Sequence, residues 1–137
     1  MAAVSWAAAD SSVTCARRWL RGWLEAIGAS IDLGVAELLL SELFTNAVQH
    51  SRARAAGNET ATDPCARIRM TTRWDRGSLR VEVSDPGGDT VPAPAAPSPD
   101  TEHGRGLLIV QALSDDWGTR DRCDGGRTVW FRLGPSR

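Results

Sequence analysis

A carboxylate and an amide stand four residues apart in the segment Glu42-Leu-Phe-Thr-Asn46, and Gln49 and His50 follow shortly after. On a helix these spacings place the four side chains along one stripe. Mg²⁺ prefers oxygen ligands and keeps several waters, so the amide oxygen of Asn46 suits it. The carboxylate of Glu42 can accept the proton of an attacking hydroxyl or water. A solvated helix edge would show the same stripe, and the helix alone does not decide between the two interpretations.

A second group of interest is Asp85-Pro-Gly87-Gly88, which follows a stretch of alternating apolar residues. In isolation this sequence is typical of an ordinary turn. An aspartate at the end of a strand can also accept a hydrogen bond from an exocyclic amine, which would distinguish adenine from guanine. Gly87 would let a base approach the backbone closely.

A third group, Gly104-Arg105-Gly106-Leu107, lies between a proline-rich segment and an apolar run. One interpretation is a flexible hinge in front of a helix. The other is an anion site, because the amides at a helix N-terminus carry about half a unit of positive charge and glycine lets phosphate oxygens reach them. Arg105 would add its charge there or lie outside the site.

The composition excludes several mechanisms. All 16 basic residues are arginine, so a Walker A loop, a protein-kinase fold of the eukaryotic type and Schiff-base chemistry are excluded because each needs a lysine. A net charge of -1 gives no global attraction to nucleic acid or anionic lipid. The apolar runs fall far short of the roughly 20 residues that span a bilayer, and no secretory signal is evident. We therefore expect a cytoplasmic protein that binds neither nucleic acid nor membrane directly.

The elements that must position these groups follow from periodicity. Apolar residues recur at three- and four-residue steps over 10–27, which predicts a helix ending near Gly28, and a second helix begins after the cap residue Asp32 and runs to about Arg54. Alternation predicts a hairpin of strands over 66–74 and 78–84, and a second hairpin over 117–122 and 127–133. Between the hairpins, residues 85–103 hold five prolines and predict a long loop or lid, and a buried helix starts at Leu107.

This order of elements predicts a two-layer α/β sandwich, in which helices cover one face of a mixed, mostly antiparallel sheet. The length of 137 residues fits one domain over 1–137.

The three groups, in this order and these settings, resemble the GHKL (histidine-kinase-like) ATPases over nearly the whole chain. The segment from Glu42 to His50 looks like the N box of that superfamily, Asp85-Pro-Gly87 like its first glycine box, and Gly104-Arg-Gly106-Leu107 like its second. Within the superfamily the chain is most similar to the small anti-sigma-factor serine/threonine kinases.

The resemblance implies a histidine-kinase-like ATPase fold with ATP and Mg²⁺ as cofactors. It makes Glu42 the catalytic base and Asn46 the Mg²⁺ ligand. Asp85 and Thr128 would meet the adenine. The remaining binding residues would border the phosphate chain or the lid, and they are Gln49, His50, Gly87, Gly104, Arg105, Gly106 and Leu107.

The function implied is a protein serine/threonine kinase that phosphorylates an anti-sigma-factor antagonist and regulates transcription by sequestering a sigma factor. Sensor histidine kinases and gyrase-like or chaperone ATPases need further domains, for which we expect no room here. Gly88 follows Gly87 directly, and Asp89 takes the place of a second glycine common in the family. This departure prompts the alternative of an ATP-binding interaction module with weak or no transferase activity. A homodimer is left open.

Overall fold

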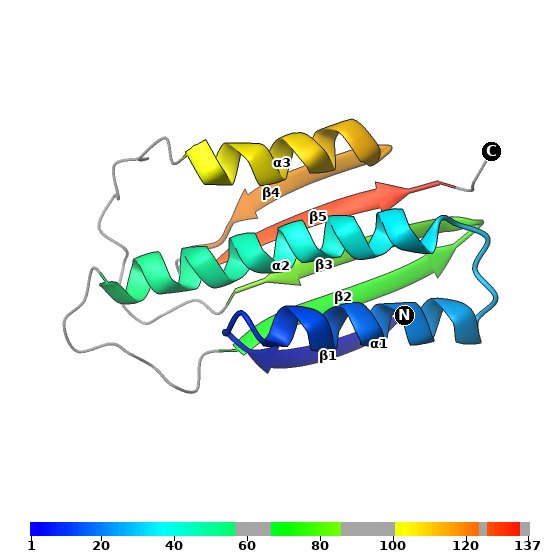
Figure 1. Cartoon of the computed structure of the whole chain (residues 1–137), viewed down its shortest axis with the longest axis horizontal. Helices are drawn as coiled ribbons and strands as arrows, with labels where there is room; N and C mark the ends of the chain where they lie inside the picture. The colour runs from blue at the N-terminus through cyan, green and yellow to red at the C-terminus, as the bar shows by residue number, and fades with distance from the viewer. Residues whose placement is uncertain (57–66, 86–100, 124–125, 135–137) are drawn as a thin grey trace.

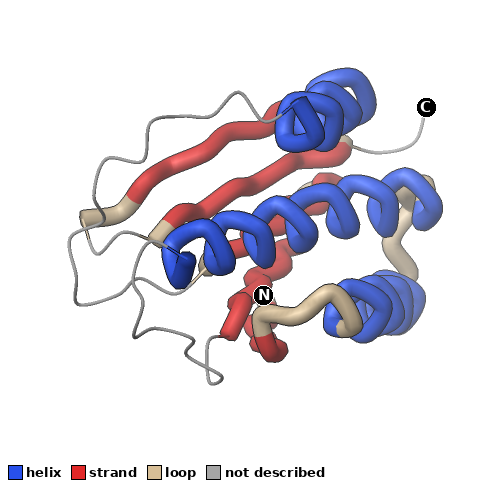
Figure 2. Tube along the Cα trace, turned by 60° about the vertical axis from the view of Figure 1, so that its left-hand side comes forward, coloured by secondary structure: helices blue, strands red, loops and turns tan. Residues whose placement is uncertain are grey.

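Five strands and three helices form two layers in the computed structural model of the protein, which describes residues 1–56, 67–85, 101–123 and 126–134, with the backbone alone for 52–56 and 101–106. The strands form one sheet in the order β1-β2-β3-β5-β4. All three helices cover the same face of this sheet (Figures 1 and 2). In chain order the elements are β1 (Ala2–Ala7), α1 (Ser12–Ala26), α2 (Leu33–Ala56), β2 (Arg67–Asp75), β3 (Ser78–Ser84), α3 (Thr101–Leu113), β4 (Asp116–Asp121) and β5 (Arg127–Leu133).

The architecture confirms the predicted two-layer α/β sandwich with helices on one face. The sheet differs in one respect from the mixed sheet that the sequence predicted. Each pairing between neighbouring strands is antiparallel in the part of the chain that the structure describes.

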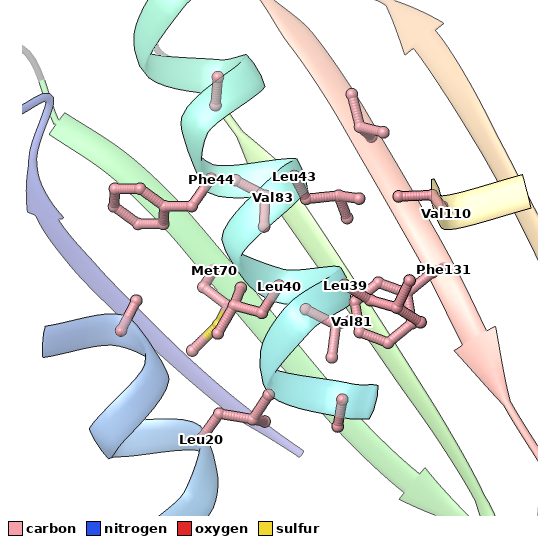
Figure 3. Close-up of a cluster of buried hydrophobic side chains, with 14 of the residues drawn as sticks. Leu20, Leu39, Leu40, Leu43, Phe44, Met70, Val81, Val83, Val110 and Phe131 are labelled. Carbon is pink, nitrogen blue, oxygen red and sulfur yellow. The ribbon is translucent and has the colours of Figure 1, made fainter. Parts of the chain in front are cut away.

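Helix α2 lies at the centre of the helical layer and contacts α1, α3 and three strands of the sheet. Its apolar side chains interdigitate with those that alternate along β2, β3 and β5 (Figure 3). Each fully buried leucine or phenylalanine contributes about 1.5–3 kcal/mol of transfer free energy, which makes this contact the main source of stability. The side chains of α2 in this core are those of Ala36, Leu39, Leu40, Leu43, Phe44, Ala47 and Val48.

The ends of the first two helices follow from local chemistry. The backbone N–H of Val35 donates to Asp32 Oδ1 at 3.1 Å, so Asp32 caps α2 as predicted. Gly28 has a φ of 67°, and the N–H of Ala29 bonds back to the carbonyl of Leu24 at 3.0 Å. A residue in this left-handed conformation after a helix is usually glycine, which explains why α1 ends here.

The β2–β3 hairpin also follows the sequence closely. Asp75 pairs with Ser78, so Arg76 and Gly77 form a two-residue loop, and their φ values are 53° and 78°. Positive φ at both loop residues matches the right-handed twist of the flanking strands.

Strand β1 was not predicted from the sequence. Apart from Val4 and Trp6, the residues from Ala2 to Ala7 are small, and they give little alternation in hydropathy. The strand is fixed by tertiary contact, because the Trp6 ring lies edge-on to the rings of Trp19 in α1 and Phe44 in α2, at centroid distances of 6.4 and 6.1 Å. Trp6 thus attaches the edge strand to two helices.

Helix α3 begins earlier than predicted. The sequence placed a glycine turn at Gly104 to Gly106 and the helix start at Leu107, whereas the helix starts at Thr101 and includes all three residues. Thr101 and Glu102 are typical of a helix N-terminus. Two glycines in the first turns cost about 1 kcal/mol each relative to alanine, and the packing of the following apolar residues outweighs this cost.

Some predictions lie outside the described residues. These are residues 86–100 of the proposed lid, Gly87 among them; residues 101–103, also assigned to the lid, belong to α3. Among the helices that the structure describes, none has the combination of length and apolarity needed to cross a membrane.

Candidate functional site

The described residues of the predicted site lie on elements that meet at one end of the molecule, on the left in Figure 1. This end holds the C-terminal half of α2, the beginning of α3, and the point where β3 ends beside the beginning of β5. Antiparallel pairing explains the last juxtaposition, since Ser84 at the end of β3 lies opposite Thr128 near the start of β5.

The polar stripe of α2 is not a solvated edge. Asn46 is only 8% exposed, and Glu42, Gln49 and His50 are half-buried. Glu42 and Asn46 are one helical turn apart, so a carboxylate and an amide oxygen face the same region.

Asp85 is the most confined carboxylate of the site, with its side chain fully buried. Its Oδ2 is hydrogen-bonded to Nδ1 of His50, and its Oδ1 accepts from the backbone N–H of Arg127. The Asp85 N–H in turn donates to the Arg127 carbonyl at 3.1 Å. A carboxylate offers about four lone-pair positions, so Asp85 still has acceptor capacity for an amine.

Arg122 joins this aspartate to the β4–β5 hairpin. Its Nη2 donates to the Asp85 carbonyl at 2.6 Å, and its Nη1 donates to Thr128 Oγ1 at 3.3 Å. Thr128 is 4% exposed, and its hydroxyl lies 2.8 Å from that of Ser84. The structure therefore brings Thr128 next to Asp85, the two residues that the family resemblance assigns to the adenine.

Gly126 provides the space for the Arg122 guanidinium. A Cβ at this position would lie 2.8 Å from Cζ of Arg122 and 2.9 Å from the Asp85 carbonyl oxygen. Since real Cβ atoms do not approach other heavy atoms this closely, a side chain here would displace Arg122 or the end of β3.

An ion pair between Arg127 and Asp121 joins the two strands of the same hairpin. Arg127 Nε lies 2.8 Å from Asp121 Oδ1. The hydrogen bond from Arg127 holds the pKa of Asp121 below its ordinary value, against a smaller opposing effect of burial and with help from the positive charges of Arg127 and His50.

The segment Gly104 to Gly106 is helical and does not form the glycine turn that the sequence predicted. Gly104, Arg105 and Gly106 lie in the first two turns of α3, which packs beside α2. The N–H groups without an intrahelical acceptor precede Gly104, so Thr101, Glu102 and His103 supply the donors available to an anion at this helix end. Leu107 is half-buried and packs against the core.

Sequence reasoning did not single out Arg122, Arg127 or Ser84. Their role depends on pairing between β3 and β5, which are separated by more than 40 residues. The sequence holds one weak signal for Arg122, which is the pair Gly125-Gly126 shortly after it. Glycines leave room for a neighbouring side chain to pack closely against the backbone.

Comparison with known proteins identifies the architecture. The sequence profile described as histidine kinase-like ATPase domain matches residues 6–133. The chain belongs to the histidine kinase-like ATPase domain family. Among solved structures, the nucleotide-free catalytic domain of the histidine kinase ThkA is similar, with a TM-score of 0.52, 14% identity, and 98% of this chain and 97% of that chain covered. At this identity the likeness shows the fold alone. No curated protein shows significant sequence similarity.

Membership in the histidine kinase-like ATPase family indicates ATP binding, usually with Mg²⁺, and the residues present fit both. The amide oxygen of Asn46 is the donor type that Mg²⁺ prefers, and it is buried on the helix that leads to His50 and Asp85. Asp85 is a buried acceptor held at a fixed position, as recognition of an adenine amine requires.

Proposed function

We propose that the protein is an ATP-dependent serine/threonine kinase of the anti-sigma-factor type. Its substrate would be a hydroxyl of an anti-sigma-factor antagonist protein, and in its other state it would sequester a sigma factor. The observation that carries the proposal is the stripe of α2, where half-buried Glu42 lies one turn from buried Asn46 and two turns from His50, which contacts Asp85.

The chemistry follows from these positions. Asp85, with Thr128 beside it, would orient the adenine, and Asn46 would hold Mg²⁺ against the phosphates. Bound ATP supplies the phosphoryl group and Mg²⁺ offsets its charge. Glu42 would accept the proton of the serine or threonine hydroxyl as that oxygen attacks. Gln49 and the Gly104 end of α3 would border the phosphates, with Arg105 and Leu107 beside them.

The supporting arguments are of two kinds. The family match and the geometry support an ATP site. The resemblance of the segment Glu42 to His50, and of Gly104 to Leu107, to the serine kinases supports the choice of acceptor. Intact Glu42 favours a transferase over a binding module.

The decisive experiment is transfer of labelled phosphate from ATP to candidate antagonist proteins encoded near this gene. We expect Glu42→Ala to abolish transfer, at least 100-fold, while leaving ATP affinity nearly unchanged, because a general base contributes about 10²–10⁴-fold to rate. Asn46→Ala should weaken Mg²⁺-dependent ATP binding as well, which calorimetry measures. Full activity of the Glu42→Ala variant would exclude this glutamate as the base.

The second candidate function is an ATP-binding interaction module without useful transferase activity. It is favoured by the helical conformation of Gly104 to Gly106, which differs from the glycine turn that the sequence predicted. In that case the parent protein would bind Mg²⁺-ATP yet transfer no phosphate to any candidate partner, and Glu42→Ala would change nothing measurable.

A further inference from the structure

The sheet has a second face that no described helix covers (Figures 1 and 2). Side chains alternate along each strand, so those of Leu79, Val81 and Val83 enter the core and those between them point to the other side. We call this other side the open face.

The open face is strongly basic, although the chain as a whole has a net charge of -1. Alternation and register place six arginines on it and three carboxylates, those of Asp75, Glu82 and Asp116. This excess of arginine over carboxylate on one face does not follow from the composition, because positive and negative charges are nearly balanced in the whole chain. The arginines are Arg67, Arg69, Arg73, Arg80, Arg120 and Arg132.

Three of these arginines lie in one row across the centre of the sheet. Arg73 of β2 pairs with Arg80 of β3, and Arg80 pairs with Arg132 of β5. Like charges directly opposite each other destabilise a sheet. Arg80 has a carboxylate partner, Glu82 Oε1 at 3.1 Å. Within the described parts of the chain Arg73 and Arg132 form no ion pair, although Asp116 of β4 lies opposite Arg132 in the register. Binding of an external anion would offset the repulsion between these neighbouring arginines.

We propose that the open face binds an acidic helix of a partner protein, whose carboxylates meet the row Arg73–Arg80–Arg132. Neighbouring strands are about 4.7–4.9 Å apart, and side chains three or four residues apart on a helix are about 5–6 Å apart. A stripe of aspartate or glutamate along one helix therefore matches the spacing of the row. Arginine binds carboxylates with two parallel hydrogen bonds, which adds specificity to the charge.

Other anionic partners fit the open face less well. Its one aromatic side chain, Trp130, lies against Gly118, where a Cβ would be 2.8 Å from the indole Nε1, and the Arg80 guanidinium lies 4.0 Å from the centroid of the ring. This ring is already engaged by the protein and offers no platform for stacked bases or for insertion into lipid. A second copy packed on this face would oppose arginine to arginine.

The inference goes beyond the proposed function, because it involves neither ATP nor Glu42, and it can be tested separately. The probe is a fluorescent alanine-based helical peptide that carries glutamate at every third or fourth position, and the control peptide carries glutamine at the same positions. Fluorescence anisotropy measures the affinity of each for the full chain. We expect the glutamate peptide to bind at least about tenfold more tightly, as charge-assisted hydrogen bonds predict.

The variant Arg73→Gln/Arg132→Gln should lose about tenfold or more in affinity for the glutamate peptide. The matched control is Arg17→Gln/Arg18→Gln, which removes the same charge from exposed positions of α1, and it should bind like the parent. Circular dichroism and ATP affinity should be those of the parent in both variants.

Four results would overturn the proposal. The first is equal affinity for the two peptides, and the second is equal loss in both arginine variants. The third is tighter binding of a DNA oligonucleotide or of phosphatidylglycerol vesicles than of the glutamate peptide. The fourth is sedimentation showing self-association that the Arg73→Gln/Arg132→Gln variant abolishes.

Discussion

The candidate site depends on how a single aspartate is held. Asp85 accepts hydrogen bonds at both carboxylate oxygens, from His50 and from the Arg127 backbone, and its own carbonyl accepts from Arg122. A buried carboxylate with these partners cannot rotate without breaking at least one of them. Such confinement lets one acceptor distinguish an amine from a carbonyl on a base, because the site cannot relax to accommodate the wrong group.

The first prediction concerns this acceptor. Asp85→Asn should reduce ATP affinity by about tenfold and remove the preference for ATP over GTP, since an amide can donate to a guanine carbonyl that a carboxylate would repel. Calorimetry with both nucleotides measures the change. An unaltered ratio of the two affinities would show that adenine is recognised elsewhere, even if the absolute affinities fell.

At this scale the sequence predicted the residues of α2 better than those of the hairpin. Glu42, Asn46 and His50 could be placed together because the helical period depends only on local spacing. Arg122 and Arg127 could not, because their contacts with Asp85 require the pairing of β3 with β5, for which the sequence gives no register. The approach of His50 to Asp85 likewise depends on how α2 lies over the sheet.

Among the elements, α2 and the two hairpins follow from the sequence because each carries its own signals. Asp32 caps the helix, and Arg76-Gly77 forms the turn. β1 and the start of α3 do not follow, since Trp6 obtains its partners only in the folded protein and the Gly104 region is helical despite its composition. In both cases tertiary packing outweighs a weak local preference.

The second prediction tests the β4–β5 hairpin as the support of Asp85. Gly126→Ala should reduce ATP affinity by about tenfold, because the new methyl group would displace Arg122 or the Asp85 carbonyl, and overpacking typically costs about 1–3 kcal/mol. Calorimetry measures the affinity and circular dichroism confirms the fold.

The control for this variant is Gly22→Ala in α1, where an added Cβ would meet nothing within 4 Å. It should leave ATP affinity unchanged and stabilise the protein by about 0.5–1 kcal/mol, since alanine favours a helix over glycine by that amount. If Gly126→Ala bound ATP like the Gly22→Ala control, the close packing at Gly126 would have no role in the site.

On the scale of the whole molecule, one ion pair joins two helices of the helical layer. Arg21 of α1 is paired with Glu37 of α2 through bonds of 2.8 and 3.0 Å. This pair connects the two helices that cover the sheet beside β1. Its contribution to stability must depend on pH, because one partner is a carboxylate.

The third prediction concerns acid unfolding. The hydrogen bonds from Arg21 lower the pKa of Glu37, although partial burial opposes the shift. Since the pKa of Glu37 is lower in the folded than in the unfolded state, the unfolded state binds more protons below the ordinary glutamate pKa of about 4.3. The stabilising contribution is therefore fully present above that pH and is lost as pH falls through the folded-state pKa. Glu37→Gln should melt at a lower temperature than the parent at pH 7, and its Tm should decline less steeply as the pH falls from about 5.

The same substitution at Glu25, whose carboxylate only approaches Arg21 at 3.9 Å and is 58% exposed, should leave the curve of the parent nearly unchanged. Parallel curves of Tm against pH for the parent and Glu37→Gln would show that the pair between α1 and α2 does not contribute to acid sensitivity.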